Sequence, residues 1–282
     1  MKTISIITPS YNQDSFIEET IKSIWSQAGG FKIEHLVMDG GSNDKTVSIL
    51  KRYEKRLKRK KYPIKCNGVQ FHWVSKSDKG QSDAINQGLK KASGDILAYL
   101  NSDDAYESMA FSRVINSLIK KGDDLVYSDC YIIDENSKKT GLLRSKNINL
   151  ETYLNENNYI PQPTVFFKRK VYETLGGFNQ NYHYAMDYDY FIKAAKQFKL
   201  SYLSGKPLAR FRIYKNSKSV SNANKSWQEA RKICLKHGGK FFSQSFLAYY
   251  RQRFRFFLKK FGYDPEPTLV HLSGIKQKIF NP

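Results

Sequence analysis

The chain has 282 residues and carries 47 Lys+Arg against 26 Asp+Glu, a formal net charge of +21. Its 18 Phe, 19 Tyr and 3 Trp exclude disorder throughout, and no uncharged run approaches the ~20 apolar residues of a membrane-spanning helix. The length fits one large domain, or one domain with an appendage. Cys66, Cys130 and Cys234 form no CxxC pair, which predicts reduced cysteines in a cytoplasmic protein.

Most of the positive charge is confined to two segments. Residues 51–65 contain nine Lys/Arg and one Glu, and residues 231–282 contain eleven Lys/Arg and two acidic residues. The remainder has 27 basic and 23 acidic residues. A nucleic-acid binder, a membrane-surface protein and an enzyme of anionic substrates are all compatible with this charge.

Apolar β-branched runs alternate with segments of helical spacing over roughly the first 130 residues. The predicted strands are 4–8, 33–38, 71–74, 96–100 and 125–127. A first helix is predicted from apolar residues at 17, 21, 24 and 25 and ends before Gly29, and further helices are predicted at 46–60, 82–94 and 107–120. Pro9 is expected to end the first strand, and Ser15 with Glu18 to form a capping box at the first helix. The crossovers are long enough for parallel strands, so the pattern predicts an α/β fold with a parallel sheet.

The pattern is less regular after residue 134. Strands are predicted at 164–167 and 209–214, and a helix at 187–198. Because no internal repeat or low-complexity linker separates this part from the first, we expect it to complete the same domain.

Polar clusters follow four of the predicted strands, at residues 9–12, 39–44, 76–83 and 101–104. In open α/β sheets, ligands bind at the carboxyl ends of the strands. The four clusters therefore predict one binding site along one edge of the sheet.

Asp103 and Asp104 are adjacent carboxylates at a strand end. They repel each other unless a cation or hydrogen bonds offset the repulsion, and Mg²⁺ or Mn²⁺ prefers such oxygen ligands. Taken alone, the pair is also explained by a solvated turn or by the N-cap of the following helix, since Asp is favoured there.

Two nucleotide-binding classes are excluded by missing motifs. Residues 8–13 read Thr-Pro-Ser-Tyr-Asn-Gln, without the glycines of a dinucleotide-binding loop, and no GxxxxGK[ST] loop occurs. No Ser-His-Asp or Cys-His arrangement is evident either.

The ordered motifs at 4–12, 38–46, 78–88 and 100–104 together resemble the family 2 glycosyltransferases. The resemblance covers roughly residues 3–215. It implies an inverting, nucleotide-sugar-dependent enzyme with a GT-A α/β fold, a mainly parallel twisted sheet flanked by helices. We expect a catalytic domain at 1–220, with a nucleotide-binding half at about 1–130 and an acceptor half at about 131–220, and a helical C-terminal extension at 221–282.

The resemblance also implies roles for single residues. On the donor side it implies nucleotide-base contacts of Thr8, Pro9, Tyr11 and Asp39, the last accepting from the base (usually uracil), and places Asp78 and Lys79 near the base and the ribose–phosphate. Asp103 matches the last carboxylate of the Asp-x-Asp metal motif, with Asp104 beside it and Mn²⁺ or Mg²⁺ as the metal. Asn101 stands where the motif has its first Asp, which implies fewer protein ligands for the metal.

On the acceptor side, Asp187 matches the catalytic base and Asp189 belongs to the same acidic pair. The alternative for Asp187 is a helix N-terminal acid stabilised by the helix dipole. Gln162 resembles a Gln-Pro loop near the acceptor, or lies in a rigid turn without ligand contact. Arg212 is expected near phosphate oxygens, and Tyr214 stands where relatives often have His.

These residues predict a single displacement. One carboxylate deprotonates an acceptor hydroxyl while a metal stabilises the leaving diphosphate. The expected donor is a UDP-sugar, and the expected acceptor is a glycan or a lipid-linked glycan in cell-surface polysaccharide synthesis. The alternatives are a nucleotide-sugar-binding protein without activity, or a sugar nucleotidyltransferase; the latter usually has a Gly-rich loop after the first strand, which is absent here.

The basic segments are explained without nucleic acid. Residues 51–65 are expected to be a solvated helix end, and the aromatic residues at 246, 250, 254, 257 and 261 are flanked by cations. That stripe, within 245–261, is typical of a helix in an anionic membrane interface, or of a helix docked on the domain. No nucleic-acid-binding module is recognisable, so we expect a cytoplasmic protein, peripheral at the inner face of the membrane.

Overall fold

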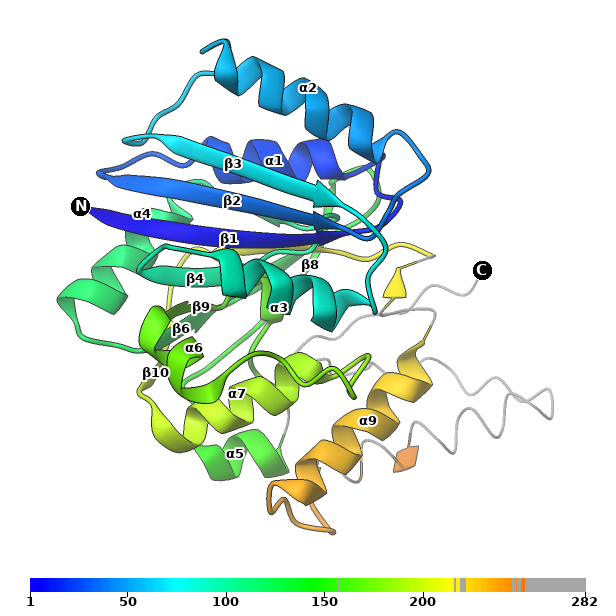
Figure 1. Cartoon of the computed structure of the whole chain (residues 1–282). Coiled ribbons are helices and arrows are strands. Elements are labelled where there is room, and N and C mark those ends of the chain that lie inside the picture. Colours follow the sequence, from blue (N-terminus) through cyan, green and yellow to red (C-terminus); the bar gives the residue numbers. More distant parts are fainter. Residues whose placement is uncertain (157, 216, 219–221, 245–246, 248–249, 252–282) are drawn as a thin grey trace.

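The computed structural model describes residues 1–156, 158–215, 217–218, 222–244, 247 and 250–251. In this part of the chain a large sheet has seven strands in the order β10-β6-β9-β4-β1-β2-β3 (Figure 1). Its members are β1 (Lys2–Ser10), β2 (Phe31–Asp39), β3 (Val69–Ser75), β4 (Ile96–Tyr99), β6 (Leu125–Ser128), β9 (Phe166–Lys168) and β10 (Leu200–Leu203). Only β9 runs antiparallel to its neighbours β4 and β6 among these strands, so the predicted mainly parallel α/β sheet is confirmed.

Helices cover both faces of the large sheet, with one apolar core under each layer. One core is built with α1 (Ile17–Trp25), α2 (Thr46–Lys58), α4 (Ala110–Ile115) and the π-helical turn η1 (Asn116–Lys120). The other is built with α3 (Gln81–Lys91), α5 (Leu150–Asn155), α6 (Arg169–Leu175), α7 (Met186–Gln197) and α9 (Ala223–Lys236). The central strands are buried on both sides, which is why they read as continuous apolar runs.

A second sheet has four described strands, and of these the sequence analysis predicted only β11. Its order is β5-β11-β7-β8, with β5 (Ala105–Tyr106), β11 (Ala209–Arg212), β7 (Cys130–Ile133) and β8 (Lys139–Leu143). The β5 and β11 pairing joins residues about a hundred positions apart, and strands this short carry little periodicity of their own. The sheet brings the end of β11 next to the 101–104 turn.

Pro9 does not end the first strand, as was expected from its missing N–H. β1 pairs with β2 as far as Ser10, whereas β4 pairs with β1 only from Ile4 to Ile7. The Ser10 carbonyl accepts from Gly40 on the β2 side, so the adjacent Pro9 nitrogen faces the side where β4 has already ended. A proline costs no ladder hydrogen bond there.

The predicted capping box of the first helix is wrong. The helix begins at Ile17, and the Ser15 hydroxyl donates to Asp14 instead of capping it. Glu18 is drawn to Lys22 and Arg52. The carbonyl of Gln13 accepts from Phe16 and Ile17, so backbone groups satisfy this helix start.

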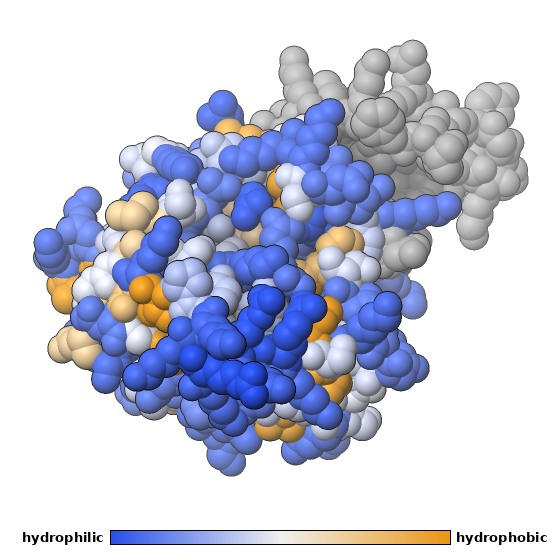
Figure 2. All heavy atoms as spheres, turned by 90° about the horizontal axis from the view of Figure 1, so that it is seen from above, coloured by the Kyte–Doolittle hydropathy of each residue, from blue (hydrophilic) through white to orange (hydrophobic). Residues whose placement is uncertain are grey.

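The basic segment 51–65 is a solvated surface, as predicted. α2 faces the core with Leu50 and Tyr53, and its cations point outward. Figure 2 views the molecule from the α2 side and shows a largely hydrophilic face.

The start of the C-terminal segment packs on the domain. Ile233 and Cys234 of α9 are buried in the core under α5 and α7, and the Cys234 thiol donates to the Leu154 carbonyl. Of the aromatic stripe predicted within 245–261, only residues 247, 250 and 251 lie inside the described residues. Among the helices described, none is long and apolar enough to cross a membrane, and all three cysteines are free thiols.

Candidate active site

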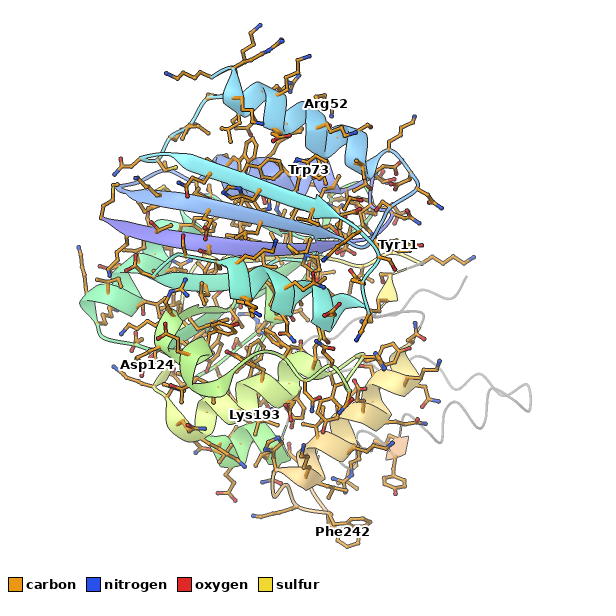
Figure 3. All side chains as sticks on the ribbon, viewed as in Figure 1. Tyr11, Arg52, Trp73, Asp124, Lys193 and Phe242 are labelled. Atoms are coloured by element: carbon orange, nitrogen blue, oxygen red, sulfur yellow. The ribbon has the colours of Figure 1, made fainter. Side chains whose placement is uncertain are left out.

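Four polar clusters meet at one edge of the large sheet, as the sequence predicted. β4, β1, β2 and β3 are adjacent and parallel, so the residues that follow them share their carboxyl-terminal edge. Figure 3 shows Tyr11 at this edge, beyond the ends of the β1 and β2 arrows. Tyr11 is 60 % exposed, in contrast to the buried strand that precedes it.

Asp39 organises the loop at the end of β2. Its Oδ2 accepts from the backbone N–H of Ser42 (2.9 Å) and from the Ser75 hydroxyl (2.6 Å), and its Oδ1 accepts from the Ser42 hydroxyl (2.5 Å). Gly41 has φ +86°, a conformation that favours glycine and that turns the following N–H groups toward the carboxylate. Because the carboxylate is buried and holds its own loop, it retains little capacity beyond one further donor at Oδ1.

Tyr11, Gly40 and Asp78 form one small surface at the same edge. A Cβ at Gly40 would lie 3.0 Å from Asp78 Oδ2 and 3.4 Å from Tyr11 Cδ2. The other Asp78 oxygen accepts from the Gly80 N–H at 2.7 Å. Lys79 is exposed beside it. The missing side chain at Gly40 therefore lets an aromatic ring and a carboxylate approach each other closely at this edge.

Thr8 does not face this surface, which corrects its expected role as part of the base wall. Its side chain is fully buried, with Oγ1 3.0 Å from Nε2 of His35. The Trp25 indole N–H donates to Nδ1 of His35, so the His35 proton is on Nε2 and is donated to Thr8. Burial lowers the pKa of His35 to about 3 and keeps the ring neutral. Pro9 is also buried, within β1.

The Asp103–Asp104 turn follows β4 and is deeply set. Asp104 is 1 % exposed; its Oδ1 accepts from the Arg212 backbone N–H (2.9 Å) and its Oδ2 from Asn101 Nδ2 (3.3 Å). Asp103 is more open, with the Tyr214 hydroxyl 3.3 Å from Oδ2. Burial raises the pKa of both carboxyls, and the charge of Asp103 raises the pKa of Asp104 further.

Arg212 holds this turn from behind, so the expected contact with phosphate oxygens is corrected. Its side chain is 1 % exposed and stacks over the Phe16 ring, 4.6 Å from the centroid. Nη2 pairs with Glu19 (2.5 Å), Nε donates to the Asp103 carbonyl (2.8 Å) and Nη1 to the Asp134 carbonyl (2.7 Å). The guanidinium is engaged on every nitrogen, which leaves it little to offer a ligand.

Asp187 lies in the first turn of α7 and shares a neighbour with the Asp103–Asp104 turn. The charges of Asp187 and Asp104 both raise the pKa of the buried Tyr99 hydroxyl, after the larger effect of burial. Burial raises the pKa of Asp187 to about 6, while the Tyr188 N–H and Lys218 act in the opposite direction. Asp187 is therefore at a helix N-terminus, as the alternative explanation had it. It is also a partly buried carboxyl with a raised pKa.

A partly buried anion from α9 fixes the loop that precedes Asp187. The two carboxylate oxygens of Glu229 accept from the backbone N–H groups of His183 (2.8 Å), Tyr184 (2.6 Å) and Ala185 (2.6 Å). These are donors just ahead of a helix start, where an anion is stabilising. Nothing in the sequence pattern singled out Glu229.

Asp189 is not brought to the Asp187 side of α7. Two residues further along a helix point about 200° away, and Asp189 pairs with Lys193 (2.5 Å) and with His237 Nε2 (2.8 Å). Figure 3 shows Lys193 below the sheet, away from Tyr11. Asp189 thus joins α7 to the end of α9.

Gln162 does lie at the site, in the 3₁₀ turn η2 (Gln162–Thr164). Its Nε2 donates to the Tyr99 carbonyl (2.9 Å) and its Oε1 accepts from Asn101 (3.3 Å). Gln81, which lies in the 78–88 motif but was given no role, also reaches this group, and Lys218 Nζ donates to its Oε1 at 2.7 Å.

The donor set suits a hard divalent cation with few protein ligands. No cluster of three or more His, Cys, Asp or Glu suited to a metal occurs among the described residues. Asp103 and Asp104 nevertheless place two carboxylates in a desolvated turn, where burial raises the pKa of both and their mutual repulsion raises that of Asp104 further. Mn²⁺ or Mg²⁺ bound chiefly by Asp103 would supply positive charge there.

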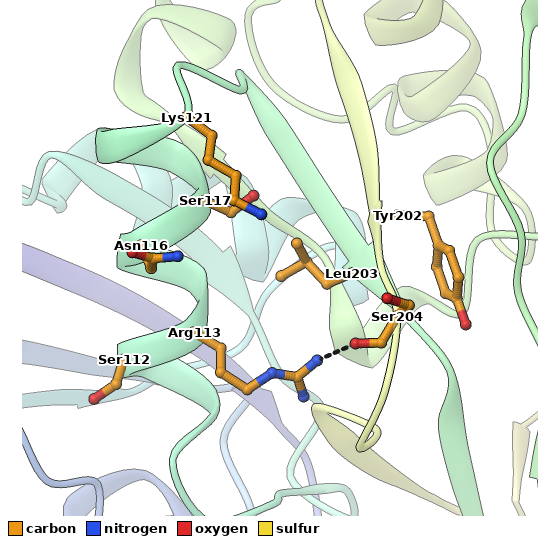
Figure 4. Close-up of a pocket in the computed structure, with 8 residues that line it drawn as sticks. All are labelled: Ser112, Arg113, Asn116, Ser117, Lys121, Tyr202, Leu203 and Ser204. Atoms are coloured by element: carbon orange, nitrogen blue, oxygen red, sulfur yellow. Dashed lines mark hydrogen bonds between the residues drawn. The ribbon is translucent and has the colours of Figure 1, made fainter.

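A separate cavity of about 390 Å³ lies between α4, η1 and β10 (Figure 4). Arg113 reaches across it and donates to the Ser204 carbonyl at 2.8 Å. Among the described residues that line it, none was predicted from the sequence as a site residue.

Comparison with known proteins places the chain among glycosyltransferases. The sequence profile of "Glycosyl transferase family 2" matches residues 5–255. An uncharacterized glycosyltransferase of Mycobacterium tuberculosis is 29 % identical over 197 residues, 68 % of this chain and 69 % of that protein. An uncharacterized glycosyltransferase of Haemophilus influenzae is 29 % identical over 228 residues, 80 % of this chain and 85 % of that protein. A PGL/p-HBAD biosynthesis glycosyltransferase of Mycobacterium bovis is also 29 % identical, over 67 % of this chain and 68 % of that protein.

Solved structures share the fold. S. aureus TarS 1-349 in complex with UDP-GlcNAc aligns with a TM-score of 0.64 at 18 % identity, over 91 % of this chain and 73 % of that one. The mannosyltransferase PcManGT from Pyrobaculum calidifontis, in complex with GDP-Man and Mn²⁺, aligns with a TM-score of 0.62 at 17 % identity, over 88 % of this chain and 69 % of that one. The chain spans 43 % of a longer TarS structure. The GT-A fold expected from the sequence is confirmed. Because the family profile covers most of its length, the chain belongs to glycosyl transferase family 2 and is a glycosyltransferase.

Proposed function

We propose that this glycosyltransferase moves a sugar from a UDP-sugar to an acceptor hydroxyl by a single displacement that inverts the anomeric carbon. The observation that carries the proposal is that two carboxylates, Asp187 and Asp104, both act on the buried Tyr99 hydroxyl and raise its pKa beyond the effect of burial. A single displacement needs a base and a site for the leaving group at one place. Two structures that share the fold support a nucleotide-sugar donor, since one is a complex with UDP-GlcNAc and the other a complex with GDP-Man.

The donor nucleotide would lie along the carboxyl ends of β1, β2 and β3. We propose that the base lies beside Tyr11 and Asp78, with the free lone pair of Asp39 Oδ1 accepting from its N–H. Lys79 would lie near the ribose and the phosphates. A uracil offers one ring N–H for such an acceptor, which favours UDP.

The reacting end of the donor would lie between Asp103 and Asp187. Mn²⁺ or Mg²⁺ held by Asp103 would supply positive charge for the leaving diphosphate. Asp187 would take the proton of the acceptor hydroxyl. In the same step the acceptor oxygen bonds to the anomeric carbon and the bond from that carbon to the diphosphate breaks. The nucleoside diphosphate leaves with that electron pair, so no covalent enzyme intermediate is needed.

The acceptor is proposed to be a glycan or a lipid-linked glycan of the cell surface. The support is a relative whose name places it in PGL/p-HBAD biosynthesis. We further propose a peripheral position at an anionic membrane, supported by the eleven Lys/Arg and two acids of residues 231–282.

The Asp187→Asn variant tests the proposal most directly. Turnover of UDP-sugars, measured as UDP release with Mn²⁺, should fall by about 10² to 10⁴-fold, the usual contribution of a general base. UDP affinity, measured by calorimetry, should be unchanged because Asp187 does not contact the nucleotide in this proposal.

Folding provides the internal control for that variant. The pKa of Asp187 is raised in the folded protein, so its ionised form disfavours folding near neutral pH. Asp187→Asn should therefore unfold at the same temperature as the wild type or higher. Retained turnover would remove Asp187 as the base, and turnover with GDP-sugars alone would replace UDP as the nucleotide.

A further inference from the structure

Asn101 stands at the centre of a hydrogen-bond chain that crosses the site. Its Oδ1 accepts from Gln81 Nε2 at 2.7 Å, and its Nδ2 donates to Asp104 Oδ2 and to Gln162 Oε1, both at 3.3 Å. Gln81 in turn accepts from Lys218 at 2.7 Å. Side chains from four separate segments are thus connected through one amide.

The groups at the two ends of this hydrogen-bond chain allow only one orientation of its amide groups. Lys218 can only donate, so Gln81 must present its oxygen to Lys218 and its NH₂ to Asn101. At the other end the Tyr99 carbonyl can only accept, so Gln162 must present its NH₂ to Tyr99 and its oxygen to Asn101. Both requirements give Asn101 the same orientation, oxygen toward Gln81 and NH₂ toward Gln162.

Asp104 requires that same orientation independently. Its Oδ1 accepts from the Arg212 backbone N–H, and its Oδ2 faces the Asn101 NH₂. An amide at position 101 therefore satisfies one donor and two acceptors at once. A carboxylate there would still accept from Gln81, but it would oppose two oxygens without a proton between them and add a third negative charge beside Asp103 and Asp104.

We propose that Asn101 is a positioning residue that, with Gln81, fixes the Asp104 carboxylate and the Gln162 amide, and that restoring an aspartate at 101 would weaken the site. The departure from the Asp-x-Asp pattern is then an exchange of a charge for two directed hydrogen bonds. The positioning role rests on the proposed nucleotide-sugar function; the direction of the hydrogen bonds does not.

Asn101→Asp is the decisive variant, because an extra ligand and a broken hydrogen-bond chain predict opposite results. Without ligand, its unfolding temperature should fall by about 3 °C or more, as expected for two opposed buried acceptors. In calorimetry, its affinity for UDP in the presence of Mn²⁺ should fall about tenfold, and its affinity for UDP without metal should change less than about twofold. Gln70→Glu makes the same chemical change at an exposed position of β3 and should alter neither quantity.

Gln81→Glu tests the direction of the chain from the other side. It keeps an acceptor for Lys218 but presents an oxygen to Asn101, so Asn101 must turn its amide and lose its bonds to Asp104 and Gln162. The effect on Mn²⁺-dependent UDP binding should resemble that of Asn101→Asp, and the double variant should lose less than the product of the two single losses.

Three outcomes would overturn the proposal in distinct ways. Asn101→Asp could bind UDP with Mn²⁺ as tightly as the wild type or more tightly, with an unchanged unfolding temperature. Position 101 would then simply lack a metal-binding carboxylate, and Asn101 would have no positioning role. If Asn101→Asp loses the same factor in UDP affinity with and without Mn²⁺, Asn101 is a structural residue only. If the wild type binds no UDP at all, the proposed function fails and the positioning role with it, while the unfolding temperatures still decide the hydrogen-bond direction.

Discussion

At the scale of single residues, the chemistry of the site depends on how far each carboxylate is removed from water. Asp39 is surrounded by hydrogen-bond donors, whereas Asp187 has few and its pKa is raised to about 6 by burial. A carboxylate with a raised pKa is a better proton acceptor that is still ionised at neutral pH. The same desolvation that strains the fold at Asp187 therefore suits the role of base proposed for it.

The pH dependence of turnover should report this environment. A base with a pKa of about 6 is protonated and inactive below that pH, so kcat should rise tenfold per unit at acidic pH and level off above about 7. Lys218 lowers the pKa of Asp187, so Lys218→Met should move the acid limb to higher pH. The measurement is a pH–rate profile at saturating donor with fixed Mn²⁺. An acid limb of the profile near pH 4, or one that does not shift in Lys218→Met, would contradict the assignment of Asp187 as the base.

At the scale of elements, two buried polar groups connect segments that are distant in the chain. Arg212 joins β11 to α1 and to the turn after β4, through Glu19 and the carbonyls of Asp103 and Asp134. His35 joins β2 to β1 and α1, through Thr8 and Trp25. Each has its partners in place, which is what makes a buried polar group tolerable.

Arg212→Met should destabilise the protein rather than merely weaken ligand binding. The substitution removes the donor of the Asp103 and Asp134 carbonyls and one of the two cations paired with Glu19, which keeps Arg210 and Ser137, at a cost of about 3 kcal/mol. Urea unfolding without ligand measures this directly. A variant of wild-type stability that has lost only UDP affinity would instead return Arg212 to the phosphate-binding role expected from the sequence.

His35 should make stability fall in mild acid. Its pKa is about 6.5 when unfolded and about 3 when folded, so the unfolded chain takes up the proton first. Stability is lost as the pH drops below about 6.5, by about 2 kcal/mol between pH 7 and pH 5. His35→Gln keeps an acceptor for Trp25 and a donor for Thr8 but does not titrate. Its stability loss over this range should be smaller by that amount, as denaturant unfolding at the two pH values will show; an equal loss contradicts the prediction.

At the scale of the whole molecule, α9 belongs to the catalytic unit although its sequence lies beyond the motifs. Ile233 and Cys234 complete the core under α5 and α7, and Glu229 binds the loop that leads into Asp187. The catalytic domain predicted to end at residue 220 is therefore proposed to extend through α9.

Two truncations separate the roles of the C-terminal segment. A chain of residues 1–222 should aggregate or unfold at a markedly lower temperature, because it exposes the core that α9 covers. A chain of residues 1–244 should remain folded, yet lose binding to vesicles containing anionic lipid if the membrane is contacted by residues 245–261. Scanning calorimetry and vesicle sedimentation check the two halves. A stable 1–222 chain would restore the earlier boundary, and vesicle binding by 1–244 would remove the membrane role of the stripe.

The sequence by itself determined the alternating α/β order, the shared edge of the polar clusters and the candidate Asp103, Asp187 and Gln162. The first two follow from local apolar periodicity and from the rule that parallel strands end together. Asp187 and Gln162 were implied by the family resemblance, and Asp103 by that resemblance and by its place beside Asp104 at a strand end. The sequence also showed that Asn101 stands where the Asp-x-Asp motif has its first Asp, but not which hydrogen bonds the asparagine makes. The side-chain assignments of Thr8 and Arg212 were wrong because both residues lie next to the site while their side chains point into the protein.

Only the tertiary structure decided which groups are already occupied. The direction of the Asn101 amide is set by Lys218 and the Tyr99 carbonyl, and the engagement of Arg212 is set by Glu19, nearly two hundred residues away. Hydrogen-bond capacity is a property of partners that the fold brings together across long loops, and no local pattern records it. The net charge of +21 lies mostly in residues 51–65 and 231–282, outside the four motifs, whereas the proposed chemistry rests with a few carboxylates that the fold takes out of water.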